Sequence, residues 1–160
     1  MNWKYKTTPM EDITQFPDNT FGFVYMTTHT PTGKSYIGKK VLFHNKKQKI
    51  GKKDLAKLQG VVGRRPSYKL VVKESDWKTY YGSQKDIKQL LSEGKKDEFE
   101  RTILKCVETK KQLTYFETKY QMLYEVLEKP DDFYNDNILG KFFTKDLSNL
   151  EFISLVENTK

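Results

Sequence analysis

The sequence predicts a small α/β (α+β) domain in which a three-stranded antiparallel sheet is flanked by helices. Three observations support this fold class. The chain has 160 residues, which suits one domain with a modest core. Segments near residues 21–43 and 98–106 are rich in aromatic and β-branched residues, as strands are. Residues 111–128 repeat apolar side chains with the period of a helix.

The first two strands are predicted to form a hairpin. Residues 1–20 are polar and contain two prolines, so we expect an extended N-terminal extension. Phe21–Thr28 reads as the first strand and Ser35–Phe43 as the second. Between them, Pro31 stands two residues before Gly33, a spacing that is typical of a turn.

A long basic insertion follows the second strand. From Val41 to Asp76, eight lysines and two arginines against three acidic residues give a net charge of +7, out of +8 for the chain. Residues 44–66 are predicted to be a loop holding a short helix at Lys53–Gln59, followed by a short strand at Ser67–Lys73. A clustered positive charge favours a polyanion partner, although a solvated loop is the simpler alternative.

The second half of the chain supplies the flanking helices. Ser83 is a plausible N-cap for a short amphipathic helix that ends at Gly94. Glu98–Cys106 is the expected third strand. The strongest helix covers residues 111–128 and ends before Pro130; its predicted buried stripe is Leu113, Phe116, Tyr120, Leu123 and Leu127.

The C-terminal region completes the predicted organisation. Residues 134–143 are expected to be a loop with some extended structure, and residues 146–157 a short closing helix. The chain then divides into an N-terminal extension (1–20), a main domain (21–145) carrying the basic insertion (44–76), and a C-terminal helix or tail (146–160).

Composition excludes several kinds of site. Cys106 is the single cysteine, so the chain has no intramolecular disulfide, and the two histidines do not complete a closed Cys/His zinc site. We find no apolar run long enough for a membrane span and no signal peptide. These features predict a cytoplasmic protein without a membrane partner.

Gly33-Lys34-Ser35 resembles the end of a phosphate-binding loop, but the rest of that motif is missing. The first glycine of the motif would stand at position 28, which is Thr28. Pro31 lies inside the would-be cradle and has no N–H to offer a phosphate. Gly33 is therefore better interpreted as a turn residue.

The two hairpin strands carry a second motif. Phe23-Val24-Tyr25 lies on the first strand and Tyr36-Ile37-Gly38 on the second, with ten residues between the two tyrosines. This pattern resembles the GIY-YIG nuclease family, although Gly22 stands one position before the usual place of the first glycine. The resemblance spans roughly residues 21–143, and "DWKTYYGSQKDIKQLL" is similar to phage-encoded members, which would place the protein in the host cytoplasm.

The resemblance implies a set of site residues. A metal-binding glutamate on a late helix corresponds to Glu117 in "LTYFETKYQ", and the Asn that follows that helix corresponds to Asn135, with Asn137 as the second candidate. Mg²⁺, or Mn²⁺, takes oxygen ligands and keeps several waters, so one carboxylate suffices to hold it. Tyr25 and Tyr36 would lie near the scissile phosphate, and one of them would orient or deprotonate the attacking water.

Two points remain open in the sequence. A neighbouring cation, Lys39 or Lys40, would favour a phenolate on the tyrosines; the family pattern favours Lys39 in the site, whereas the alternation of a strand favours Lys40. Many family members also carry a helical arginine about ten residues after the second motif. Lys46 occupies that position here, and the chain offers Arg64, Arg65 and Arg101 instead.

The expected function is magnesium-dependent DNA endonuclease activity. Its catalytic residues would be Tyr25, Tyr36, Lys39, Lys40, Glu117 and Asn135. DNA phosphates would be contacted, without reading of sequence, by Lys46, Lys47, Lys49, Lys52, Lys53, Arg64 and Arg65. The alternatives are a non-catalytic nucleic-acid-binding module on the same fold, or a phage protein whose basic loop binds an acidic protein. Whether the protein is a monomer or a homodimer does not follow from the sequence.

Overall fold

The computed structural model describes residues 2–58, 60, 63 and 67–147. The chain forms two compact units. The first combines the residues up to Leu42 with those from Asp76 onward, and the second is Phe43–Ser75. Among the described residues, no helix is both long and apolar enough to cross a membrane.

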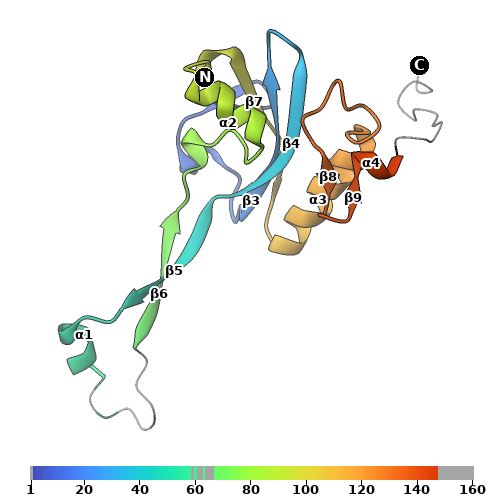
Figure 1. The fold of residues 1–160 in the computed structure, drawn as a ribbon. Coiled ribbons are helices and arrows are strands. Elements are labelled where there is room, and N and C mark those ends of the chain that lie inside the picture. Colours follow the sequence, from blue (N-terminus) through green and yellow to red (C-terminus); the bar gives the residue numbers. More distant parts are fainter. Residues whose placement is uncertain (1, 59, 61–62, 64–66, 148–160) are drawn as a thin grey trace. The chain divides into compact units, whose positions relative to one another are not determined.

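A five-stranded mixed sheet is the centre of the first unit (Figure 1). Its strands, in spatial order, are β2 (Thr8–Met10), β1 (Trp3–Tyr5), β7 (Phe99–Val107), β3 (Gly22–His29) and β4 (Lys34–Val41). The α+β class and the three predicted strands, now β3, β4 and β7, are confirmed. Strand β1 runs parallel to β7, and the other neighbours are antiparallel.

The prediction of a purely antiparallel, three-stranded sheet was wrong. Part of the expected N-terminal extension forms β1 and β2, which add two strands beside β7. Trp3 of β1 is buried, and its ring meets those of Phe23 and Tyr25 edge-on, both at 5.2 Å. Strands of three residues are too short to show a periodic pattern, so their pairing depends on partners far along the chain.

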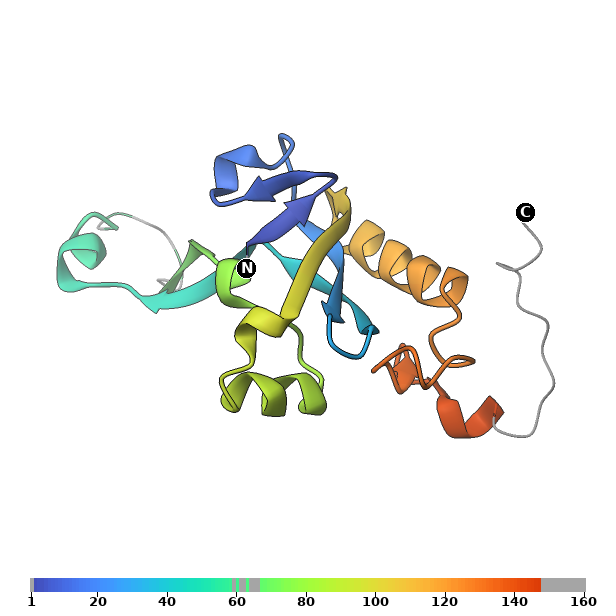
Figure 2. The ribbon, with the colours of Figure 1, turned by 90° about the horizontal axis from the view of Figure 1, so that it is seen from above.

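Alternation along β3 sends side chains into two cores, one on each face of the sheet. Phe23 and Tyr25 pack with Trp3 and Trp77 on one face. Val24 packs with Leu113 and other residues of the helical layer on the opposite face. Figure 2 shows the helices α2 (Lys85–Ser92) and α3 (Lys110–Leu123) on opposite sides of the sheet.

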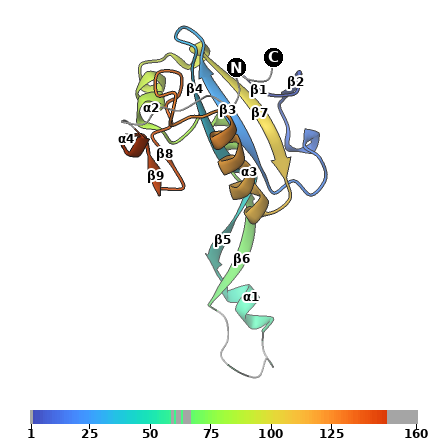
Figure 3. The same ribbon diagram turned by 90° about the vertical axis from the view of Figure 1, so that its right-hand side faces the viewer.

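The long predicted helix begins as expected but ends earlier. Thr109 caps α3 by accepting a hydrogen bond from the N–H of Gln112, and the helix lies across β3 and β4 (Figure 3). It ends at Leu123 because Glu125 adopts a left-handed conformation, with φ of 55°, well before Pro130. Leu123 is consequently 51% exposed rather than part of the buried stripe.

Helix α2 also departs slightly from expectation. Its N-cap is Gln84 rather than Ser83, because the side-chain oxygen of Gln84 accepts from the N–H groups of Asp86 and Ile87. Ile87 anchors the helix against Phe99 in a small third core. The described residues of this unit also form three short 3-10 helices: η1 (Ile13–Gln15), η2 (Trp77–Thr79) and η3 (Lys96–Glu98).

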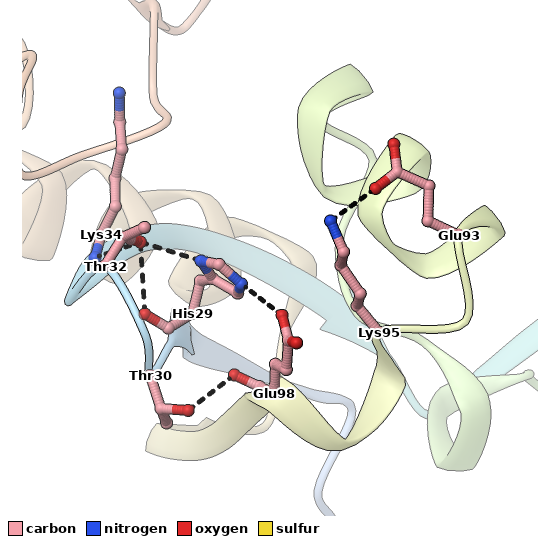
Figure 4. A network of polar contacts seen from close by, with 7 residues as sticks. All are labelled: His29, Thr30, Thr32, Lys34, Glu93, Lys95 and Glu98. Atoms are coloured by element: carbon pink, nitrogen blue, oxygen red, sulfur yellow. Dashed lines mark hydrogen bonds and ion pairs between the residues drawn. The ribbon is translucent and has the colours of Figure 1, made fainter.

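The turn between β3 and β4 is held by a buried histidine (Figure 4). The ring nitrogens of His29 lie 2.8 Å from Thr32 Oγ1 and 2.9 Å from Glu98 Oε2, which ties the turn to the start of β7. Gly33 has a φ of 71°. Its role as a turn residue, predicted from the failed phosphate-loop motif, is confirmed.

The second unit is a two-stranded antiparallel ribbon. Strand β5 (Phe43–Lys49) pairs along its whole length with β6 (Tyr68–Glu74), and α1 (Lys52–Ala56) follows β5. The prediction of a loop from residue 44 was wrong, since lysines mask the strand character of β5. The predicted strand at Ser67–Lys73 corresponds to β6, and the predicted short helix lies near α1.

A small hairpin follows α3 in the chain. Strands β8 (Asn137–Ile138) and β9 (Phe142–Phe143) pair across a turn in which the N–H of Lys141 donates to the carbonyl of Ile138. Leu139 and Gly140, at the centre of the turn, have φ of 58° and 63°. A left-handed conformation costs a residue with a Cβ about 1–2 kcal/mol.

The chain then enters α4 (Thr144–Leu147). The rest of the predicted closing helix, 148–157, lies outside the described residues.

Candidate active site

The two motif tyrosines lie side by side on β3 and β4. Tyr25 is 1% exposed, and its ring centroid is 6.2 Å from that of Tyr36. Gly38 pairs with Tyr25 across the strands, and a Cβ on Gly38 would stand 2.6 Å from the Tyr25 hydroxyl oxygen. The glycine of Tyr36-Ile37-Gly38 therefore makes room for the Tyr25 phenol.

The surroundings of these tyrosines favour the neutral phenol. Burial raises the pKa of Tyr25 well above its usual value, and the neighbouring Tyr80 and Tyr36 phenols add to the shift. Burial also raises the pKa of Tyr36, against a lowering by the Ser83 hydroxyl. The direction of both shifts, with burial as the largest cause, is away from the phenolate that a neighbouring lysine was expected to favour. Both tyrosines are neutral phenols near pH 7.

Lys39 forms an ion pair with the predicted metal ligand. Its Nζ lies 2.7 Å from Oε2 of Glu117 and 3.3 Å from Oγ1 of Thr114, both on α3. The Glu117 side chain is 16% exposed and that of Lys39 is 38% exposed, so the carboxylate is the more shielded partner of this pair. The other carboxylate oxygen, Oε1, is the donor that remains for a cation.

Lys40 points to the other face of β4. Its Nζ lies 2.6 Å from Oδ1 of Asp76 and 4.0 Å from the centre of the Tyr80 ring. Of the two lysines that the sequence left open, Lys39 is therefore the one that the structure brings to Glu117.

A cleft of about 490 Å³ opens beside Glu117. Because β4 is the edge strand, the cleft receives Tyr36 and Lys39, although these two side chains belong to opposite faces of the strand. Polar residues that sequence reasoning missed also line it: Ser83, Gln84, Lys85, Gln121 and Asp136. Most lie in loops or at the start of a helix, where no periodic pattern marks them.

Asn135 reaches the cleft wall as a clamp on β4. The residue is buried, its Nδ2 donates to the carbonyl of Ile37 at 2.8 Å, and its Oδ1 accepts from the Ile37 N–H at 3.0 Å. Gln121 of α3 donates to the same carbonyl at 3.1 Å. The amide of Asn135 is thus occupied by backbone, and it positions the strand that carries Tyr36 and Lys39.

The donor set fits one hard divalent cation held mainly by water. Within the described ranges, no group of three His, Cys, Asp or Glu side chains lies together, so a fully protein-made cage is not present there. Mg²⁺ commonly keeps several waters and uses one or two carboxylates. Glu117, at the wall of an open polar cleft, meets that requirement.

The remaining predicted residues lie elsewhere. Lys46, Lys47 and Lys49 are on β5, and Lys52 and Lys53 are on α1, all in the second unit. Arg64 and Arg65 lie outside the described residues.

Arg101 belongs to the core of the first unit. It is buried between the rings of Trp3 and Tyr81, at 4.7 and 4.0 Å, and its Nη1 donates to the carbonyl groups of Lys78 and Tyr80. This arginine holds the segment before α2 in place. The cations that line the cleft are Lys39 and Lys85.

Comparison with known families agrees with this geometry. Residues 3–138 match the family described as "Putative endonuclease segE, GIY-YIG domain". The chain belongs to the GIY-YIG endonuclease family. The match includes β1, which the structure places in the central sheet of this GIY-YIG domain. Family membership indicates a nuclease domain with DNA as its substrate. Neither a curated protein nor a solved structure matches the chain.

Proposed function

We propose that the protein is a DNA endonuclease that uses Mg²⁺ or Mn²⁺ to hydrolyse phosphodiester bonds. The observation that carries this proposal is the Lys39–Glu117 pair, which lies in the same polar cleft as Tyr36. Phosphodiester hydrolysis needs a positioned water, neutralisation of the phosphate charge and protonation of the leaving oxygen. The residues of this cleft are suited to these tasks.

Charge neutralisation is assigned to three residues. Glu117 would hold the divalent ion, which, when bound, supplies positive charge at the phosphate and lowers the pKa of coordinated water. Lys39, beside Glu117, would contact a phosphate oxygen, and Lys85 would approach from the start of α2. Both are point charges, so they bind phosphate without the two-pronged geometry of an arginine.

The tyrosines are assigned to positioning through neutral phenols. Tyr36 lines the cleft, and its hydroxyl lies 3.4 Å from Ser83 Oγ, so it can donate to a phosphate oxygen or orient a water. Tyr25 is buried behind it and holds its ring in place. Asn135 acts through the backbone of β4, and Lys40 through the Asp76 and Tyr80 contacts on the opposite face.

The ribbon of the second unit is proposed as an additional DNA contact. Three lysines of β5 and two of α1 are exposed and would neutralise backbone phosphates: Lys46, Lys47, Lys49, Lys52 and Lys53. Arg64 and Arg65 are proposed to join them. Such contacts strengthen binding without selecting a sequence.

A non-catalytic nucleic-acid-binding module is the second candidate. The observation that favours it is the composition of the cleft: its described basic residues are lysines, whereas many relatives use a helical arginine. A protein that had lost hydrolysis could keep the fold, the cleft and the basic ribbon.

Nicking of supercoiled plasmid separates the two candidates. Wild-type protein with Mg²⁺ should convert the plasmid to the open circle, and Glu117→Gln should abolish this while preserving a gel shift. Glu108→Gln is the matched control, because Glu108 is exposed just before α3 and lines neither described cavity. Equal gel shifts without nicking by any protein would establish the binding module instead.

A further inference from the structure

We propose that Leu139, at the tip of the β8–β9 turn, is an apolar wedge that enters the DNA base stack next to the scissile phosphate. This inference rests on the proposed nuclease function and names how the same site would distort its substrate. It comes from three independent features of the turn: its backbone conformation, its exposure and its place between two cavities.

The first feature is conformational. Leu139 and Gly140 both have positive φ, a region that Gly, Asn and Asp adopt far more readily than leucine does. Gly140 follows this preference, and its N–H donates to Oδ1 of Asn137. Leucine is a poor choice for the first position. Strained residues of this kind cluster at functional sites.

The second feature is exposure, because burial does not explain why leucine occupies position 139. Leu139 is 50% exposed, so its side chain does not recover the conformational cost by filling a core. Leu139 combines a costly backbone conformation with an apolar side chain exposed to water. We therefore expect its side chain to contact a partner outside the described structure.

The third feature is position. Leu139 lines the cleft that contains Lys39 and Glu117, and it also lines a second cavity of about 470 Å³ on the outer side of α3. The second cavity is bordered by Tyr115, which is 63% exposed, and by Lys119. Leu139 is thus the residue shared by the proposed phosphate site and an apolar hollow with an aromatic wall.

Charge favours DNA as the occupant. Lysines flank the apolar tip on both sides, Lys39 and Lys85 in the cleft that also holds Glu117 and Asp136, and Lys119 in the second cavity. Proteins that bend DNA insert leucine and similar side chains between base steps, and exposed aromatic rings stack on bases that have left the helix. A strand whose phosphate lies at Glu117 would present its neighbouring base to Leu139 and Tyr115.

The decisive variant is Leu139→Asn, which removes the apolar side chain and suits the left-handed backbone. We expect its Tm to rise by about 2–4 °C, because the strain is relieved. Nicking of intact duplex should fall roughly tenfold, because the inserted side chain offsets the free-energy cost of unstacking the bases. Nicking should recover on duplex with a one-base bulge, where unstacking costs least. Leu123→Asn is the matched control, because Leu123 is equally exposed on α3 and lines neither cavity.

Binding without cleavage provides a separate readout. A short duplex with 2-aminopurine at alternating positions of one strand becomes brighter where bases unstack. We expect wild-type protein and Leu123→Asn to increase the fluorescence in Ca²⁺ or without metal, and Leu139→Asn to bind without the increase. This measurement tests whether Leu139 enters the base stack even if plasmid nicking fails and the proposed nuclease function is abandoned.

Three results would overturn the wedge. A fall in Tm for Leu139→Asn would mean that Leu139 is buried against another part of the chain or a second copy. Nicking rates and fluorescence equal to those of Leu123→Asn would mean that the side chain does not enter the stack. An absent fluorescence increase with wild-type protein bound would mean that the DNA is not unstacked.

Discussion

The side-chain amide of Asn135 makes a two-point contact with the peptide groups of Ile37, accepting from its N–H at 3.0 Å and donating to its carbonyl at 2.8 Å. Ile37 lies on the edge strand β4, directly after Tyr36 and two residues before Lys39. Along this edge of β4 the backbone of Asp132 and Tyr134 bonds to Ser35, and the Asn135 amide continues that pairing at Ile37. This contact therefore helps to position Tyr36 and Lys39, which line the cleft.

Asn135→Ala should therefore reduce both stability and activity. It removes two hydrogen bonds and leaves buried backbone groups of Ile37 with fewer partners, for a loss of about 2–3 kcal/mol in the free energy of unfolding. Urea denaturation checks the stability, and plasmid nicking at a temperature where the variant is folded checks the activity. Gln121→Ala, which removes one bond to the same carbonyl, should cost less. Unchanged nicking in the folded Asn135→Ala protein would contradict the positioning role.

Gly38→Ala should destabilise the protein by crowding the buried phenol. Its Cβ would lie 2.6 Å from the Tyr25 hydroxyl oxygen and 2.8 Å from Tyr36, and overpacking of this kind costs about 1–3 kcal/mol. Adding Tyr25→Phe removes the closest atom, so the double variant should recover part of the loss. A double-mutant cycle by thermal denaturation measures the coupling. Additive effects would show that Gly38 and the phenol do not interact.

Lys39→Met and Lys40→Met should have different consequences. Lys39 lies in the cleft beside Glu117, so its loss should lower the nicking rate at least tenfold while leaving the fold intact. Lys40 pairs with Asp76 and covers the Tyr80 ring on the opposite face, so its loss should cost about 1 kcal/mol of stability with a smaller change in nicking. Equal losses of nicking in the two folded variants would contradict this division of roles.

Stability should fall in alkaline solution because of the motif tyrosines. Burial raises the pKa of Tyr25 and Tyr36 above the usual value of 10.0, so above that pH the folded state holds protons that the unfolded chain has released. The free energy of unfolding should be unaffected by these groups below about pH 10 and decline as pH rises through their folded-state pKa values. Denaturation of wild type and Tyr25→Phe between pH 8 and 11 tests this. The variant should show the shallower decline, and parallel curves would exclude Tyr25 as a cause.

Lysines of the ribbon should appear in the salt dependence of DNA binding. Replacing Lys46, Lys47 or Lys49 by Gln should each reduce the slope of log K against log salt concentration by about 0.9 if that lysine neutralises one phosphate. Fluorescence anisotropy over a range of salt concentrations measures the slope. Lys4→Gln is the control, since Lys4 already pairs with Glu100 on the central sheet. Unchanged slopes in all the ribbon variants would show that these lysines do not contact DNA phosphates.

The sequence by itself determined the features that depend on neighbouring residues. Turn chemistry at Gly33 defined the hairpin, 3.6-residue periodicity located α3, and the tyrosine spacing with Glu117 identified the family. These features follow from local conformational preferences and motif spacing, so they are visible without tertiary contacts.

Only the tertiary structure decided which side chains meet. Alternation along β4 favoured Lys40 for a site on one face, but β4 is an edge strand, and the cleft takes Tyr36 from one face and Lys39 from the other. The short strand β1, the clamp of Asn135 on Ile37 and the exposed Leu139 likewise depend on residues distant in sequence. Local patterns report which face a residue occupies, whereas long-range packing decides what that face is placed against.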